Sequence, residues 1–112
     1  MTLRFDIKTV SEANTREHWR VRNERKRAQQ LAFKVMWRSY RPTVTLPAEI
    51  TFTRFSCKAV DSDNLTSCFK GLRDQLAREL GIDDGGEAVR WRYEQVRLSK
   101  REHYFTVTIR QT

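Results

Sequence analysis

The segment 60–81, VDSDNLTSCFKGLRDQLARELG, constrains the fold of this chain more than any other. Its apolar side chains are spaced three or four residues apart, at Leu65, Cys68, Phe69, Leu72, Leu76 and Leu80. That spacing is typical of a helix with one apolar face. Gly81 follows at once, and glycine readily takes the left-handed conformation in which many helices end. The segment therefore predicts an amphipathic helix that ends at Gly81 and packs one face on the core.

Short segments of alternating or β-branched residues surround this helix and predict strands. They cover residues 2–8, 48–57, 89–94 and 105–110. We expect the last two to pair as a hairpin across SKRE, residues 99–102. With a helix before the second strand, the order is β-α-β-α-β-β. At 112 residues the chain is long enough for one core but not for two, which predicts a single domain over residues 1–112.

The helix predicted before the second strand has two halves that differ in composition. Asn14 and Glu17 in NTRE form a capping-box pattern, which predicts a helix from there to about Ser39. Apolar residues occupy one stripe of its second half, at Ala28, Leu31, Ala32, Val35 and Met36. The first half is rich in arginine and has no such stripe. We therefore expect the second half to pack on the core and the first half to project toward solvent or a ligand.

Positive charge is concentrated in this same helix. Between Asn14 and Arg41 the chain has nine Lys or Arg against two Glu, a net charge of +7 within a total of +8. Such a segment attracts polyanions, nucleic acid first and an anionic membrane surface second. The candidate DNA-binding residues are Arg16, Arg20, Arg22, Arg25, Lys26 and Arg27. A membrane-surface helix would need a continuous apolar face under these residues, which the sequence lacks. Trp19 is a candidate for stacking on a base, although a partly buried aromatic is the favoured interpretation.

Other features of the sequence bear on the cellular location of the protein and on the state of its cysteines. No apolar run approaches the roughly 20 residues that a membrane span needs. The N-terminal stretch MTLRFDIKTV lacks the apolar block of a signal peptide, so we expect a cytoplasmic protein. Cys57 and Cys68 have neither metal-ligand spacing nor the pattern of a disulfide framework, and we expect both to be reduced.

Pairs of aspartates flank the helix that ends at Gly81. Asp61 and Asp63 precede or open it, and Asp83 and Asp84 follow it. A structural interpretation makes them a helix cap and a turn, since Asp suits both positions. However, a cap needs one carboxylate, and paired carboxylates repel each other unless a cation lies between them. Hard oxygen ligands of this kind suit Mg²⁺ or Mn²⁺.

A lysine and another aspartate lie on the polar face of the same helix. At 100° per residue, Lys70 and Asp74 project in nearly the same direction as Asp63, opposite the apolar side chains. We expect these three side chains to share one surface. Before the helix, the period of two in an extended chain would let Asp61 and Asp63 point the same way.

These motifs together resemble a known family. DSDNL, a helix bearing KGLRDQL, then GIDD and WRYEQ are similar to the RusA-type Holliday junction resolvases, including members carried by phages and prophages. The resemblance is strongest over residues 60–95 and weaker over the basic segment. One departure is the lysine, because the family pattern places it at the position of Ser67, and Lys70 stands three residues later.

The resemblance implies a homodimeric, Mg²⁺-dependent endonuclease with an α+β fold and a mixed sheet, which cuts branched double-stranded DNA at four-way junctions. By position, Asp61, Asp63 and Asp84 match the essential carboxylates, with Asp83 as a further candidate ligand. Lys70 would stabilise charge on the phosphate, or else form a salt bridge to Asp74 on a solvated face. The alternative function is a non-catalytic nucleic-acid-binding protein that uses the basic helix 14–41. The two differ in whether the three aspartates converge on one ion.

Overall fold

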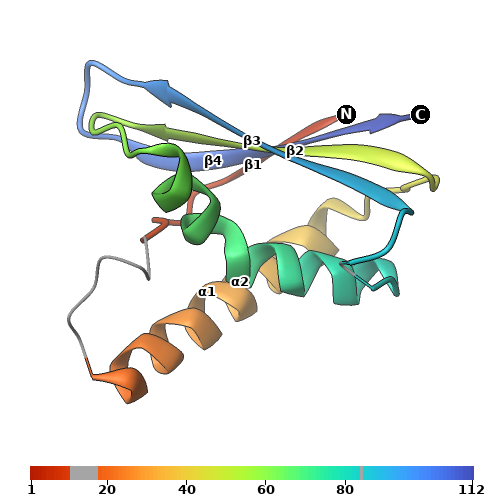
Figure 1. Cartoon of the computed structure of the whole chain (residues 1–112), viewed down its shortest axis with the longest axis horizontal. Helices are drawn as coiled ribbons and strands as arrows, with labels where there is room; N and C mark the ends of the chain where they lie inside the picture. The colour runs from red at the N-terminus through yellow and green to blue at the C-terminus, as the bar shows by residue number, and fades with distance from the viewer. Residues whose placement is uncertain (11–17, 84) are drawn as a thin grey trace.

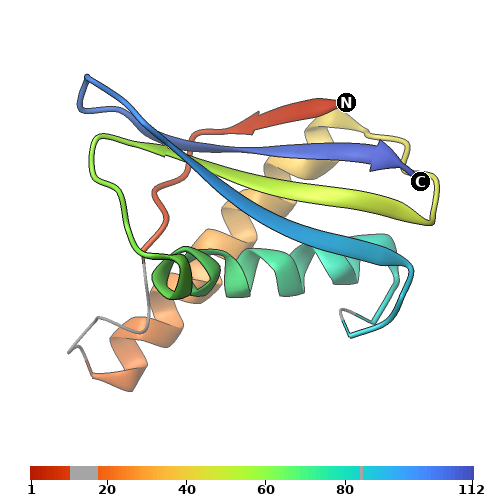
Figure 2. The ribbon, with the colours of Figure 1, turned by 45° about the horizontal axis from the view of Figure 1, so that its top comes forward.

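The computed structural model describes residues 1–10, 18–83 and 85–112. They form β1 (Thr2–Phe5), α1 (Trp19–Tyr40), β2 (Ala48–Ser56), α2 (Ser62–Leu80), β3 (Val89–Arg97) and β4 (His103–Gln111). The predicted order β-α-β-α-β-β and the α+β class are confirmed. Both helices lie on the same side of the sheet (Figures 1 and 2), so no helix of the described residues covers its other side.

The sheet is mixed, with the strand order β1-β4-β2-β3. β2 pairs with β3 in parallel and with β4 antiparallel, and β1 pairs with β4 antiparallel. The predicted hairpin between the last two strands is therefore wrong, because β2 lies between them. β2 is buried over nearly its whole length, from Ala48 to Ser56. Placing it at an edge of the sheet would expose apolar side chains such as Ile50 and Phe52, which are fully buried.

Phenylalanines from five different elements make up the centre of the core. Phe5, Phe33, Phe52, Phe69 and Phe105 are all fully buried. The rings of Phe5 and Phe33 are 4.7 Å apart, those of Phe5 and Phe105 are 5.2 Å apart, and those of Phe52 and Phe69 are 5.0 Å apart. Each such pair adds about 0.5–1.5 kcal/mol to the free energy of area burial. This cluster fixes both helices against the sheet.

The predicted face of α2 is confirmed, and its end is where the sequence places it. Leu65, Cys68, Phe69, Leu72 and Leu76 are buried, and Leu80 packs against the core. Gly81 adopts φ 67° and ψ 34°, and the N–H of the next residue, Ile82, donates to the Ala77 carbonyl at 3.0 Å. Cys57 and Cys68 are free thiols.

The core-facing side of α1 differs from the predicted stripe. Phe33 and Trp37 are its buried residues, whereas Leu31 and Val35 are 61% and 60% exposed. Ala32 and Met36 pack at the margin of the core, and Ala28 is exposed. The two aromatic side chains bury more apolar area than Leu31 and Val35 would, which explains the rotation of the helix.

The division of α1 into two halves is confirmed. Its second half packs on the core, and its first half extends away from the sheet (Figure 1) without a buried residue. The predicted start at Asn14 and Glu17 lies outside the described residues; the described helix begins at Trp19, with His18 as its N-cap. No helix in the described ranges is long and apolar enough to span a lipid bilayer.

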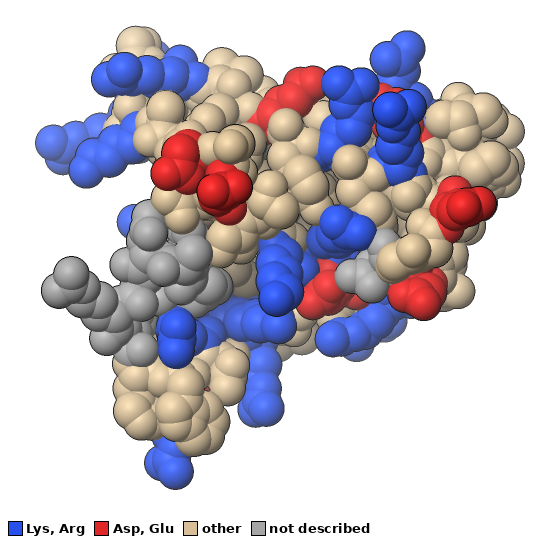
Figure 3. Space-filling view, viewed as in Figure 1, with Lys and Arg blue, Asp and Glu red and all other residues tan. Residues whose placement is uncertain are grey.

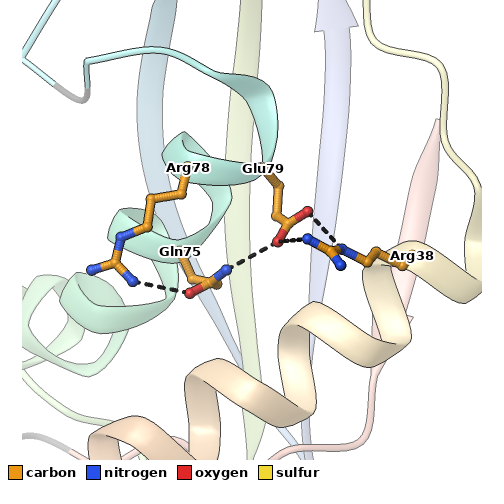
Figure 4. A network of polar contacts seen from close by, with 4 residues as sticks. All are labelled: Arg38, Gln75, Arg78 and Glu79. Atoms are coloured by element: carbon orange, nitrogen blue, oxygen red, sulfur yellow. Dashed lines mark hydrogen bonds and ion pairs between the residues drawn. The ribbon is translucent and has the colours of Figure 1, made fainter.

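A polar network joins the two helices near their C-terminal ends (Figure 4). Arg38 Nε donates to Glu79 Oε2 at 3.1 Å, and Arg38 Nη2 lies 3.4 Å from Glu79 Oε1. Gln75 Nε2 donates to the same carboxylate at 3.0 Å, and Arg78 donates to Gln75. Arg38, part of the basic segment in the sequence, is thus engaged in joining α1 to α2.

Candidate carboxylate site and nucleic-acid interface

The first pair of aspartates lies at the start of α2. Asp61 is the N-cap, and its Oδ1 accepts a hydrogen bond from the N–H of Asn64 at 2.9 Å. Asp63 lies in the first helical turn. The helix therefore begins between the two aspartates, and the expected period of two in an extended chain does not apply to them. A carboxylate has two oxygens, so capping by Oδ1 leaves Oδ2 able to bind a cation.

A groove runs along the polar face of α2. Its lining includes Asp63, Ser67, Lys70 and Asp74 from α2 and Tyr93 from β3, and its volume is about 510 Å³. The prediction that Asp63, Lys70 and Asp74 share one surface is confirmed. Ser67 and Lys70 line the same groove, because residues three apart in a helix are neighbours on its surface. The three-residue offset of the lysine therefore moves it along the groove without removing it.

The basic helix α1 reaches this groove through Lys26. Its Nζ is 4.0 Å from Asp74 Oδ2, so Lys26 forms a salt bridge with Asp74. The Lys26 side chain passes over Gly71, where a Cβ would come within 3.1 Å of Lys26 Cγ. Gln30 Nε2 also donates to the Gly71 carbonyl at 2.9 Å. The absence of a side chain at position 71 lets α1 approach α2 closely enough for these contacts.

The basic residues of α1 differ in how far they are exposed to solvent. Arg22 and Lys26 line a second cavity of about 210 Å³ between the helices, together with Lys70. Arg20 and Arg27 are exposed, whereas Arg25 is partly buried. Arg16 lies outside the described residues. Trp19 is 56% exposed at the tip of α1, so its expected partial burial is wrong and it remains a candidate for stacking on a base.

The second pair of aspartates lies beyond the other end of α2. Asp83 follows the Gly81 cap, and its Oδ1 accepts a hydrogen bond from the N–H of Gly85 at 3.1 Å. Since α2 has 19 residues, its two ends are about 28 Å apart. Figure 3 shows acidic side chains gathered near both ends of α2, with Lys and Arg between them. Asp84 lies outside the described residues.

This separation corrects the predicted set of metal ligands. Ligands of one Mg²⁺ lie about 2.0–2.1 Å from the ion, so Asp83 cannot share a cation with Asp61 and Asp63 within one copy of the chain. The part of the chain that the structure describes contains no group of three or more His, Cys, Asp or Glu residues placed to hold a metal. The reason is that the 19 residues of helix α2 lie between Asp61 and Asp83.

Gln95, which the sequence analysis did not single out, holds the connection that leads into Asp61. Its Nε2 donates to the Val60 carbonyl at 2.6 Å, and its Oε1 accepts from the Val60 N–H at 3.0 Å. Two further core-facing side chains contact the same connection. Arg54 Nη1 donates to the Lys58 carbonyl at 2.6 Å, and Ser56 Oγ is 3.4 Å from the Lys58 nitrogen. The position of Asp61 is therefore fixed from β2 and β3.

The alternation of residues in the sequence does indicate that Gln95 faces the core. Residues 89–97 alternate, and the apolar positions Val89, Trp91 and Tyr93 predict a core-facing row. Gln95 is the next member of that row. A polar side chain that continues an apolar row must find hydrogen-bond partners there.

Comparison of the chain with protein-family models, with curated proteins and with solved structures gave no match.

Proposed function

We propose that this protein is a metal-dependent, structure-selective DNA endonuclease that acts on four-way junctions as a homodimer. One observation carries the proposal: Asp63 and Lys70 line a single groove, and the basic helix α1 extends Lys26 to that groove. A carboxylate for a cation, a lysine for a phosphate and a basic helix for flanking phosphates are the parts that hydrolysis of a phosphodiester requires.

Each of these residues has a role in the proposed reaction. Asp61 and Asp63 offer hard carboxylate oxygens, which fit Mg²⁺ or Mn²⁺. When bound, such an ion polarises the scissile phosphate and makes water a stronger nucleophile. Lys70 neutralises charge that develops on the phosphate oxygens. A carboxylate not engaged with the ion accepts the proton of the attacking water.

The basic residues bring DNA to an otherwise acidic centre. Arg20 and Arg27 are exposed on α1 and are free to contact phosphates that flank the scissile bond. Trp19 is exposed beside Arg20, with the guanidinium 5.4 Å from the ring centroid. An exposed aromatic next to an arginine suits the stacking of an unpaired base at a branch point.

The separation of the two ends of α2 supports the proposal of a homodimer. If Asp61, Asp63 and the pair Asp83–Asp84 serve one centre, two copies are needed, because the two ends of α2 are about 28 Å apart within one copy. In a two-fold dimer the N-terminal end of α2 in one copy can meet the C-terminal end in the other. Such a dimer has two equivalent centres, as symmetric cleavage of a four-way junction requires.

A surface for the second copy is present on α1. Val21, Ala28, Leu31 and Val35 are all exposed, and their spacing of seven, three and four residues is that of a coiled-coil seam. We expect the double substitution Leu31→Glu with Val35→Glu to weaken dimerisation by about 10²-fold or more, since each apolar side chain contributes about 1.5–3 kcal/mol when buried. Sedimentation velocity over a range of concentrations measures this change, and circular dichroism checks that the helices persist.

The control is Val96→Glu, which places one glutamate on an exposed apolar residue of β3 at the edge of the sheet. It is expected to leave the dimer intact. Dissociation by Val96→Glu instead of the α1 substitutions would assign the interface to the sheet edge and contradict the α1 seam.

Cleavage of a synthetic four-way junction tests the proposed function. The wild-type protein is incubated with the labelled junction in Mg²⁺, in Mn²⁺ and in EDTA, beside a linear duplex of the same sequence. Symmetric, metal-dependent nicks in the junction are expected. Tight junction binding without cleavage in either metal would favour the non-catalytic nucleic-acid-binding protein, in which Asp61 is only a helix cap.

The two hydrogen bonds between Gln95 and Val60 give a prediction about the Mg²⁺ dependence of cleavage. Gln95→Ala removes both hydrogen bonds to Val60 and loosens the residue before Asp61. Because groups that orient a metal ligand typically contribute 10–100-fold to metal affinity or activity, we expect cleavage to need about tenfold more Mg²⁺. Titration of the cleavage rate with Mg²⁺ measures this. Gln111→Ala, at the exposed end of β4, serves as the control; equal Mg²⁺ requirements in both variants would contradict a positioning role.

A further inference from the structure

The row of core-facing side chains on β2 includes a buried arginine near its C-terminal end. Ile50, Phe52 and Arg54 are successive members of this row, and Arg54 is only 7% exposed. Its register partner on β3 is Gln95, and one step further along the sheet Ser56 faces His103 on β4. The helix-covered side of the sheet thus changes from apolar to polar at the end that leads to Asp61.

The charge of Arg54 has no carboxylate partner among the described residues. Its guanidinium donates from Nη1 to the Lys58 carbonyl at 2.6 Å, while Nε is buried without a hydrogen-bond partner. A neutral donor would suffice to hold a backbone carbonyl. A buried charge without a counter-charge is strongly unfavourable in the folded state, so its presence calls for an anion that comes from elsewhere.

Arg54 lines a large cavity with a strongly basic wall. The cavity has a volume of about 830 Å³, and its basic and acidic lining residues are Lys8, Arg54, Lys58, Arg101, Glu102 and His103. Four of these carry positive charge and Glu102 alone is acidic. Lys8, Lys58 and Arg101 are exposed at the rim, so a ligand can reach the buried guanidinium from solvent.

His103 is held neutral in this wall. Its Nε2 lies 3.1 Å from the backbone nitrogen of Thr9 and accepts a hydrogen bond from it. Burial, together with the charges of Arg54 and Lys8, lowers the pKa of His103 to about 4. Part of the lowered pKa of His103 thus comes from the positive charges of Arg54 and Lys8. An anion bound in the cavity would be attracted by the same field.

We propose that the cavity floored by Arg54 binds a phosphate group of the nucleic-acid backbone, one separate from the scissile phosphate. A guanidinium offers parallel N–H donors that match phosphate oxygens, and the lysines at the rim add charge without fixed geometry. The connection from Lys58 to Asp61 links this cavity to the carboxylates at the start of α2. The inference rests on nucleic acid being the ligand of the protein, but it does not depend on cleavage.

The test measures DNA binding in EDTA, so that cleavage plays no part. Arg54→Met removes the charge with little change of volume. The control is Arg110→Met, which removes an equal charge near the C-terminal end of β4, whereas His103 of the cavity lies at the start of that strand. Fluorescence anisotropy with a labelled four-way junction is expected to show about tenfold weaker binding for Arg54→Met. The slope of log K against log salt should fall by about one for this variant, as expected for one lost phosphate contact. Arg110→Met should stay close to wild type.

Two exposed variants keep the test decisive if Arg54→Met does not fold. Lys58→Gln removes a rim charge and should weaken binding, whereas Glu102→Gln removes the one carboxylate among the described residues of the wall and should tighten it. Inorganic pyrophosphate should raise the melting temperature of the wild type, at constant ionic strength, but not that of Arg54→Met. Equal DNA affinities in Arg54→Met and Arg110→Met would overturn the inference. Stabilisation by pyrophosphate without any binding of DNA would overturn nucleic acid as the ligand.

Discussion

Asp63→Asn is expected to abolish metal-dependent cleavage of a four-way junction, with a loss of roughly 10³-fold or more. The carboxylate is replaced by an amide of nearly the same shape, so the first turn of α2 keeps its length and its cap at Asp61. What disappears is a charged oxygen, the proposed metal ligand, in the groove that Lys70 also lines. The expected loss is larger than the 10–100-fold that follows when a group only orients a ligand.

Binding separates this result from simple misfolding. In EDTA the variant should bind the junction as tightly as the wild type or more tightly, because one negative charge that repels phosphates has been removed. Asp6→Asn is the matched control, since Asp6 is an exposed carboxylate that pairs with Arg4. Cleavage by Asp63→Asn at the rate of the Asp6→Asn control would exclude Asp63 from the reaction.

The part of this molecule that local sequence determines was predictable. The spacing of apolar residues in α2 identified its buried face, and Gly81 marked its end, because both depend on residues within a few positions of each other. The same helical geometry placed Asp63, Lys70 and Asp74 on one surface. These are consequences of a single helix, which needs no knowledge of its neighbours.

The strand order and the buried face of α1 were not predictable in the same way, because they depend on how segments distant in the sequence compete for places in the core. The short loop between β3 and β4 favoured a hairpin, but burial of β2 on both sides places that strand between them. On α1, two overlapping sets of apolar residues competed for the core. Phe33 and Trp37 are buried, and Leu31 and Val35 are exposed. Periodicity indicates that a helix has an apolar face, but only the fit to the sheet decides which one is buried.

Polar residues at core-facing positions of a strand mark places where the structure needs specific hydrogen bonds, but the alternation of apolar residues alone does not identify them. Arg54 continues the row of Ile50 and Phe52, and Gln95 continues the row of Trp91 and Tyr93. Both sit where the core ends and the connection to Asp61 begins. A polar side chain in such a place must satisfy its hydrogen bonds. Gln95 does so with Val60, and Arg54 does so only in part.

Mixing two inactive variants is expected to restore cleavage, because the proposed centre takes residues from both copies of a dimer. One variant is Asp63→Asn, and the other carries Asp83→Asn with Asp84→Asn. In a mixed dimer, one centre contains both defects. The second combines the intact start of α2 from one copy with the intact Asp83–Asp84 pair from the other. Random assortment makes about half of the dimers mixed, each with one of its two centres intact, so about a quarter of the wild-type activity should return.

The product of the mixed dimers carries further information. With one working centre, each binding event should nick a single strand of the junction, whereas the wild type cuts two strands symmetrically. Denaturing electrophoresis of junctions labelled on each strand distinguishes these products. Asp61→Asn mixed with Asp63→Asn is the control, because both defects lie at the same end of α2 and every centre remains incomplete. If mixed dimers form, as differently tagged copies can verify, and yet no activity returns, then Asp83 and Asp84 do not complete the centre in trans. Asp83 would then serve the turn that its hydrogen bond from the Gly85 N–H already indicates.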